Sequence, residues 1–226
     1  MMVDYTKRPN PSQPSEPAAS GAAPVSLSKV TLTKAAPSVS LAKGAGGRMR
    51  VNLSWNARPE GTGGGGFFKK LAGGNRGIDL DLGALFELSD GRKGVVQALG
   101  GAFGALDRPP YVQLDGDDRK GGGGENLTIN LDRLSEIRRV LVFAFIYEGV
   151  PAWDKADGVV TLHPQGGAPL EIRLDEHSGT RMCALALLEN AGGRLQVRRE
   201  VRYIDGAQDA LDRAYGWGMD WTPGRK

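Results

Sequence analysis

Acidic residues and glycines are concentrated in residues 111–126, with the sequence YVQLDGDDRKGGGGEN. Four carboxylates share this glycine-rich stretch, namely Asp115, Asp117, Asp118 and Glu125. Hard cations such as Ca²⁺ bind oxygen ligands on a flexible backbone that can fold around them. We therefore interpret the stretch as part of a site for a divalent cation.

A second carboxylate pair, Asp79 and Asp81, lies upstream in the sequence GIDLDL. Residues two apart in a strand point to the same side and lie about 7 Å from each other. We predict that this pair and the acidic stretch at 111–126 meet in space and hold the cation together. The alternative is a set of solvated side chains, because Gly and Asp are also the ordinary residues of surface turns.

The acidic stretch does not follow the EF-hand pattern. If Asp115 were the first ligand, Lys120 would replace the required sixth-position glycine and Asn126 the twelfth-position glutamate. A calcium site must therefore be assembled from separated segments. Several carboxylates on a flexible loop suit Ca²⁺ better than Mg²⁺. Arg119 and Lys120 offer a metal-free alternative, in which they neutralise the carboxylates by ion pairing.

The composition indicates a soluble globular protein rich in turns. Of the 226 residues, 40% are hydrophobic and 24% charged, which is ordinary for a globular domain. The 34 glycines favour an all-β fold over a helical bundle. A net charge of +3 is too small to predict a nucleic-acid partner. The single Cys183 excludes an intramolecular disulfide and a cysteine-rich zinc site.

The first residues differ from the rest of the chain. Residues 1–24 are rich in Pro, Ser and Ala and show no apolar core of a signal peptide. We predict a disordered tail there, followed by a domain at 25–226. The longest apolar run, 140–146, is far short of the ~18 residues of a membrane helix. We therefore expect a cytoplasmic protein.

Hydrophobic periodicity predicts strands over most of the domain. Alternation of apolar and polar residues indicates half-buried strands at 48–55 and 78–88, separated by a glycine-rich insertion at 57–77. The continuous apolar run 140–147 is typical of a central strand covered on both faces. Edge strands are predicted in a repeated phrase at 25–29, 30–34 and 39–43, and further strands at 94–99, 127–131, 159–162, 170–174, 182–188 and 195–204.

The spacing of these strands, ~8 to 12 residues, indicates a sandwich or a barrel. We predict an all-β fold, an antiparallel β-sandwich of two sheets with a short C-terminal helix at 207–215. One helical turn is expected at 132–137, with Asp132 as its N-cap. Trp217 and Trp221 should anchor the chain end onto the sandwich.

Other candidate chemistry is weaker. Cys183 lies in an apolar strand and is expected to be a small buried hydrophobe. The basic cluster Arg198, Arg199 and Arg202 is expected to be a solvated strand face. A metal-bound water activated by aspartates would make a metal-dependent phosphoester hydrolase, the alternative from the enzyme class.

Several phrases occur in an order that resembles a known family: VSLSK, VTLTK, VNLSWNAR, IDLD, GDDRKG and FAFIYEG. They resemble the TerD-type tellurium-resistance and general-stress proteins. With KGVVQALGGAFGALDRPPY, REVRY and AYGWGMDWTPGRK, the pattern is most similar to the TerA-like branch. The resemblance covers residues 25–226.

The resemblance implies a β-sandwich that binds calcium through loops and acts without catalysis in the stress response linked to tellurite. It also implies partners, namely other stress proteins in assemblies associated with the inner membrane. The family's acidic motifs fall on Asp79 and Asp81, and on residues 116–121. Glu125 corresponds to the remnant of a longer acidic run, and Glu148 to an acidic residue after the central strand.

The shortened acidic run removes several family ligands, so an adaptor that has lost its calcium site is a third alternative. The complete predicted ligand set is Asp79, Asp81, Asp115, Asp117, Asp118, Glu125 and Glu148.

Overall fold

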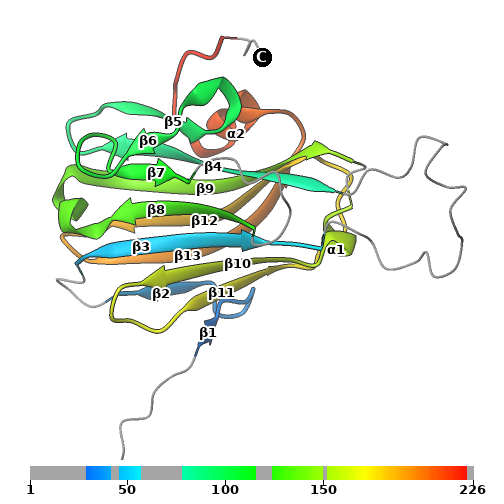
Figure 1. Cartoon of the computed structure of the whole chain (residues 1–226), viewed down its shortest axis with the longest axis horizontal. Coiled ribbons are helices and arrows are strands. Elements are labelled where there is room, and N and C mark those ends of the chain that lie inside the picture. Colours follow the sequence, from blue (N-terminus) through cyan, green and yellow to red (C-terminus); the bar gives the residue numbers. More distant parts are fainter. Residues whose placement is uncertain (1–28, 42–45, 57–77, 116–123, 150–151, 223–226) are drawn as a thin grey trace, which may run out of the picture.

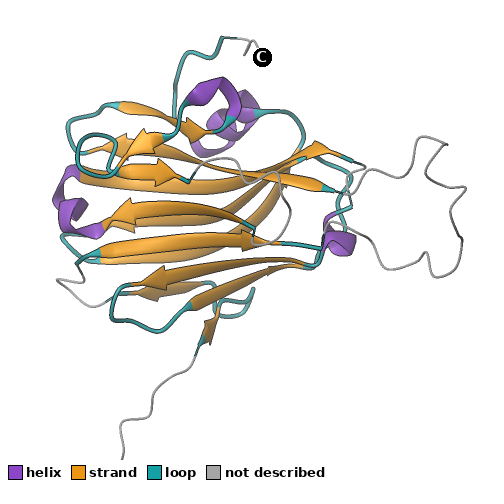
Figure 2. Ribbon diagram, viewed as in Figure 1, coloured by secondary structure: helices purple, strands orange, loops and turns teal. Residues whose placement is uncertain are grey.

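Two β-sheets packed face to face make up the molecule (Figures 1 and 2). The computed structural model describes residues 29–41, 46–56, 78–115, 124–149 and 152–222. One sheet has seven strands in the order β1-β11-β10-β3-β8-β7-β6, and the other has six in the order β2-β13-β12-β9-β4-β5. The tail at 1–24, the phrase at 25–29 except its last residue, and the insertion at 57–77 lie outside the described residues.

The seven-stranded sheet consists of β1 (Val30–Thr31), β3 (Arg48–Ser54), β6 (Gly104–Ala105), β7 (Val112–Leu114), β8 (Glu125–Asn130), β10 (Gly158–Pro164) and β11 (Leu170–Leu174). The six-stranded sheet consists of β2 (Ser38–Ser40), β4 (Asp79–Leu88), β5 (Lys93–Gln97), β9 (Ile137–Glu148), β12 (Met182–Asn190) and β13 (Leu195–Ile204).

The described helices are short. They are α1 (Trp153–Ala156), α2 (Gln208–Tyr215) and the 3-10 turns η2 (Leu99–Gly101) and η3 (Leu131–Glu136). None of them has the length and apolar character needed to cross a lipid bilayer. The predicted all-β sandwich with a short C-terminal helix is confirmed. One detail differs, because β1 runs parallel to β11 and makes the seven-stranded sheet mixed.

The core lies between the two sheets and follows from the alternation in the sequence. Met49, Val51 and Leu53 of β3 are completely buried, whereas the intervening Arg48 and Arg50 are exposed. Leu80 and Leu82 of β4 belong to the same buried cluster. Two half-apolar sheets must bury these faces against each other, which explains the sandwich.

The outer face of the six-stranded sheet is also covered, as the apolar run in β9 predicts. Leu141 and Phe143 of β9 pack with Leu211 of α2 and with Trp217. The Trp217 indole N–H donates to the Phe86 carbonyl oxygen at 3.0 Å. Trp217 is therefore an anchor of the C-terminal segment, as predicted, and α2 packs on this sheet.

Trp221 is held by a different contact. Its indole N–H donates to Asp212 Oδ2 at 3.0 Å. Asp212 is 4% exposed and also accepts hydrogen bonds from the backbone N–H groups of Gly218 and Met219. The carboxylate of α2 thus fixes the segment that follows the helix, and the anchoring role predicted for Trp221 is confirmed.

The predicted N-cap of the turn at 132–137 is wrong. The turn begins one residue earlier, and the Asn130 side chain caps it by accepting from the Asp132 N–H at 3.1 Å. Asp132 Oδ1 instead accepts from the Gly47 N–H at 2.6 Å. Asp132 was predicted from its neighbours in sequence to be the cap, but its carboxylate instead binds Gly47, which lies 85 residues away in the chain.

The solvated face predicted for three arginines of β13 is wrong for Arg199. Its side chain is 9% exposed and pairs with Glu176 at 3.0 Å. Arg198, by contrast, is half-exposed and pairs with its strand neighbour Glu200 at 2.6 Å. Cys183 is fully buried, as predicted. The helix α1 was not predicted, since its four residues are too few to show a helical period.

A buried ion pair joins β4 to β9 beneath Trp217. Glu87 is 2% exposed, and its carboxylate accepts from Arg138 Nη1 and Arg139 Nε, each at 2.6 Å. The Arg139 guanidinium also lies 3.9 Å from the centroid of the Trp217 ring. Burial alone would raise the pKa of Glu87, but the hydrogen bond and charge of Arg139, with Lys93 and Arg138, lower it overall.

Replacing this carboxylate should destabilise the protein in a pH-dependent way. Glu87→Gln is expected to lower the free energy of unfolding at neutral pH by about 3 kcal/mol, because Arg139 loses its partner in a buried setting. The folded pKa lies below 4.5, so the carboxylate stabilises fully above that pH and progressively less as pH falls through the folded pKa. Urea unfolding of both proteins along a pH series measures the difference.

The matched control is Asp209→Asn, which removes an exposed pair with Arg213 (2.9 Å) on the surface of α2. It should change stability little at any pH. An effect of Glu87→Gln that is no larger than the control, or that does not shrink in acid, would contradict the ion-pair argument.

Candidate metal centre

The start of β4 forms an exposed sheet edge that carries two of the predicted ligands. Strand β5 pairs with β4 only from Gly83 onward, so residues 79–82 extend past it. Leu80 and Leu82 point into the core, which places Asp79 and Asp81 on the outer face of the six-stranded sheet. Asp79 is exposed and Asp81 is partly buried. The strand arrangement predicted for this pair is confirmed.

A third predicted ligand lies across the ladder. Glu148, at the end of β9, is the register partner of Asp79. The register then shifts, with Leu80 opposite Ile146, so β9 bulges by one residue at this end. Directly opposed like charges destabilise a sheet. Two carboxylates placed side by side are also the donor type that hard cations bind.

Glu125 approaches the same strand from the other sheet. It is the first residue of β8, and its carboxylate accepts a hydrogen bond from the Leu82 backbone N–H. Asp115 follows β7 directly, and its backbone N–H donates to the Asn126 carbonyl oxygen at 2.9 Å. The ends of β7 and β8 therefore meet the beginning of β4, and both sheets contribute acidic residues to one end of the sandwich.

Two side chains that the sequence reasoning missed brace this end. The Trp55 indole N–H donates to the Ile78 carbonyl oxygen at 2.9 Å, immediately before Asp79. Arg181 donates to the carbonyl oxygens of Ile146 (2.9 Å) and Gly149 (3.2 Å), on either side of the β9 terminus. Neither contact has a local sequence signal, since each joins segments far apart in the chain.

The donor types fit a hard cation, since every predicted ligand is a carboxylate. Within the described residues, however, no group of three or more His, Cys, Asp or Glu is arranged to hold a metal ion. Asp117 and Asp118 lie outside these residues. The described part of the chain thus brings the strand-end carboxylates to one end of the sandwich but does not by itself form a closed site, and the ligand set stays a prediction.

The cross-sheet contact of Glu125 can be tested without metal. Glu125→Ala should lower the free energy of unfolding in excess chelator by about 1 to 3 kcal/mol, because the N–H of the buried Leu82 loses its charged acceptor. Glu125→Gln keeps an acceptor of the same shape and should recover much of the loss. Urea unfolding of the three proteins gives the comparison, and equal stability of all three would contradict a structural role for this contact.

Comparisons with known proteins show which proteins this chain is similar to. No family model matches the sequence. Tellurium resistance protein TerA from Alcaligenes sp is 53% identical over 206 residues, which cover 89% of this chain and 60% of that protein. The chain therefore spans about three fifths of the length of this curated relative.

Two solved structures share the fold. A protein of unknown function superposes with a TM-score of 0.55 at 19% identity, covering 80% of this chain and 99% of the other. A homologue of telluride resistance protein (TerD) from Streptomyces coelicolor superposes with a TM-score of 0.52 at 23% identity, covering 77% and 99%. The predicted resemblance to tellurium-resistance proteins is therefore confirmed by the Alcaligenes relative, and the two solved structures show that the chain shares their fold.

Proposed function

We propose that this chain is a non-enzymatic, calcium-binding module of the stress response associated with tellurium resistance. The observation that carries the proposal is the meeting of acidic strand ends from both sheets. Asp79 and Glu148 face each other across β4 and β9, and Glu125 of β8 contacts the backbone of β4 beside Asp81. The name of the Alcaligenes relative supports the biological setting.

Calcium would act here as a structural link. When bound, the ion would neutralise the opposed carboxylates and tie the segment 116–123 to the strand ends. Because the ligands come from distant parts of the sequence, only the folded chain can assemble them. A ligand that binds only the native state raises stability by mass action.

The first test is thermal unfolding of chelator-stripped protein during titration with Ca²⁺ and, separately, Mg²⁺. Saturating Ca²⁺ at about 100 times its dissociation constant would add about 2.7 kcal/mol. For a domain of this size that corresponds to a rise of roughly 5 to 10 °C in the unfolding midpoint. Mg²⁺ should give a smaller rise. Asp117→Ala should remove most of the calcium response.

The matched control for that variant is Asp205→Asn, which removes an exposed carboxylate in the turn between β13 and α2. This variant should keep the full calcium response. A flat response in the wild-type protein would overturn calcium binding and identify a metal-free adaptor, whose acidic stretch pairs with Arg119 and Lys120.

The alternative function is a metal-dependent phosphoester hydrolase, which the opposed carboxylates favour because they could activate a metal-bound water. A screen of phosphoester substrates with Ca²⁺, Mg²⁺ and Mn²⁺ is expected to stay at background. Hydrolysis that disappears in Asp81→Asn would establish the enzyme instead. Thiol chemistry is disfavoured, since burial raises the pKa of the Cys183 thiol and hides it from substrates.

The proposal extends to partners and location. We expect the module to work in the cytoplasm with other stress proteins, at the inner face of the membrane where those partners are attached. The chain spans 60% of the length of its curated relative, so that longer protein has further sequence that this chain does not match.

A further inference from the structure

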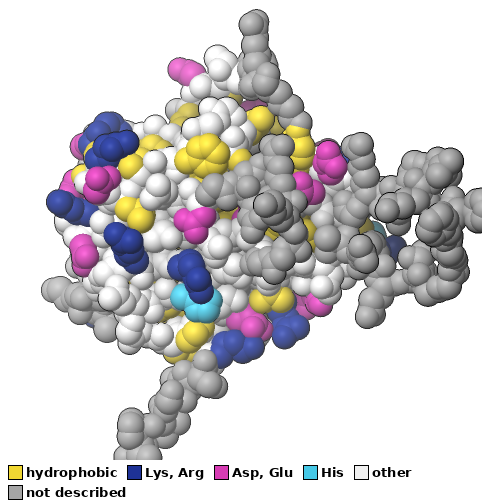
Figure 3. All heavy atoms as spheres, viewed as in Figure 1, with side chains coloured by type: hydrophobic (Ala, Val, Ile, Leu, Met, Phe, Trp, Pro, Cys, Tyr) yellow, Lys and Arg dark blue, Asp and Glu magenta, His cyan; other side chains and the backbone are white. Residues whose placement is uncertain are grey.

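The outer face of the seven-stranded sheet carries a row of basic and amide side chains. In the strand register, Arg48 of β3 lies opposite Asn130 of β8, and Arg50 lies opposite His163 of β10. These side chains point away from the core because the intervening Met49 is buried. Figure 3 shows dark blue side chains beside a cyan histidine on this face. The helix α2 packs on the other sheet.

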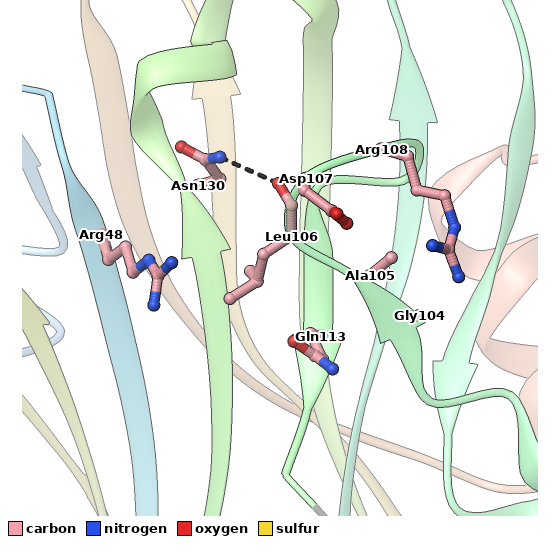
Figure 4. A pocket seen from close by; sticks show the side chains of 8 residues that line it. All are labelled: Arg48, Gly104, Ala105, Leu106, Asp107, Arg108, Gln113 and Asn130. Carbon is pink, nitrogen blue, oxygen red and sulfur yellow. Dashed lines mark hydrogen bonds between the residues drawn. The ribbon is translucent and has the colours of Figure 1, made fainter.

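A pocket of about 420 Å³ lies at the border of this face. It is lined by Arg48, Gln113, Asn130 and the turn at 104–108. Figure 4 shows Arg48 reaching from β3 toward Leu106, with Gln113 below the turn. The Asn130 side-chain amide donates to the Leu106 carbonyl oxygen at 2.8 Å, which fixes the turn against β8. The pocket therefore has a defined wall of polar groups.

Two arginines that line this pocket, Arg48 and Arg108, and the neighbouring Arg50 of β3 differ from most other arginines of the described residues. Within the described residues, the guanidinium groups of Arg48, Arg50 and Arg108 make no hydrogen bond and no ion pair. By contrast, Arg139 and Arg199 are paired with carboxylates. A guanidinium presents a planar set of donors that matches oxyanions. Guanidinium groups that make no ion pair, next to amide groups held in place, form the kind of site that binds anions.

The charges around His163 agree with a positive local field. Burial lowers the pKa of His163, and the neighbouring cation Arg50 lowers it further. On the other side of β10, Glu171 forms ion pairs with Lys29 at 2.6 Å and with Arg173 at 3.3 Å. The Glu171 carboxylate on β11 is thus neutralised by its own partners.

We propose that the pocket binds a small oxyanion, such as inorganic phosphate or tellurite, with Arg48 as the principal contact and Gln113 and Asn130 as orienting groups. Asp107 also lines the pocket. Its carboxylate repels anions and lowers their affinity, so removing its charge should have the opposite effect to removing the charge of Arg48. The pocket is separate from the acidic end of the sandwich, where we propose that a cation binds.

The test is a titration of the full chain with phosphate, and separately with tellurite, at constant ionic strength and followed by NMR of the backbone amides. Saturable shifts are expected around the pocket for at least one anion. Arg48→Ala should weaken binding about tenfold or more, the value of a charge-assisted hydrogen bond. Asp107→Asn should tighten it. Comparison of the two dissociation constants shows which oxyanion the site prefers.

Arg194→Ala is the matched control, because Arg194 is exposed in the turn between β12 and β13 and its side chain has no partner among the described residues. The control removes the same charge and should leave binding unchanged. Equal weakening in the two arginine variants would show general attraction to a basic protein and overturn the site. Absence of saturable shifts with both anions would overturn it as well.

Discussion

The acidic end of the molecule depends on the hydrogen bond between the Leu82 backbone N–H and the Glu125 carboxylate. Strand β5 stops short of Leu82, so this N–H has no neighbouring strand to accept it on that side. A buried amide without an acceptor is costly, and the acceptor here comes from the opposite sheet. The shared core between the sheets brings β8 close enough for one side chain to reach β4, and the contact fixes where the strand ends meet.

The same end of the sandwich is held by contacts to the backbone beside its carboxylates. The carbonyl groups beside Asp79 and Glu148 are held in turn by Trp55 and Arg181. These contacts hold the backbone beside Asp79 and Glu148, whereas Asp115 and Glu125 flank the glycine-rich residues 116–123.

The sequence allowed accurate prediction wherever a structure depends on local periodicity. Strand alternation located β3 and β4 and the faces that they bury, and the bounds of β11 and β13 were predicted without error. Errors arose where a distant partner decides the outcome. The Asp132 carboxylate accepts a hydrogen bond from Gly47 instead of capping the turn, and the buried Arg199 pairs with Glu176. Strand β1 runs parallel to β11, whereas an antiparallel sheet was predicted. For the candidate site, spacing predicted that acidic segments meet, but no local pattern encodes the register that sets Asp79 opposite Glu148.

Strand geometry also explains why one small sandwich can hold two regions of opposite charge. The strands β3 and β8 pair from Leu53 opposite Glu125 to Arg48 opposite Asn130, so the acidic end and the basic pocket lie at opposite ends of one strand pair. Five residues of extended strand span roughly 17 Å. The Debye length at physiological ionic strength is about 8 Å, so exposed charges at the two ends are largely screened from each other. A cation at the acidic end therefore leaves the field at Arg48 nearly unchanged, and the two regions can act independently although the same strands build both.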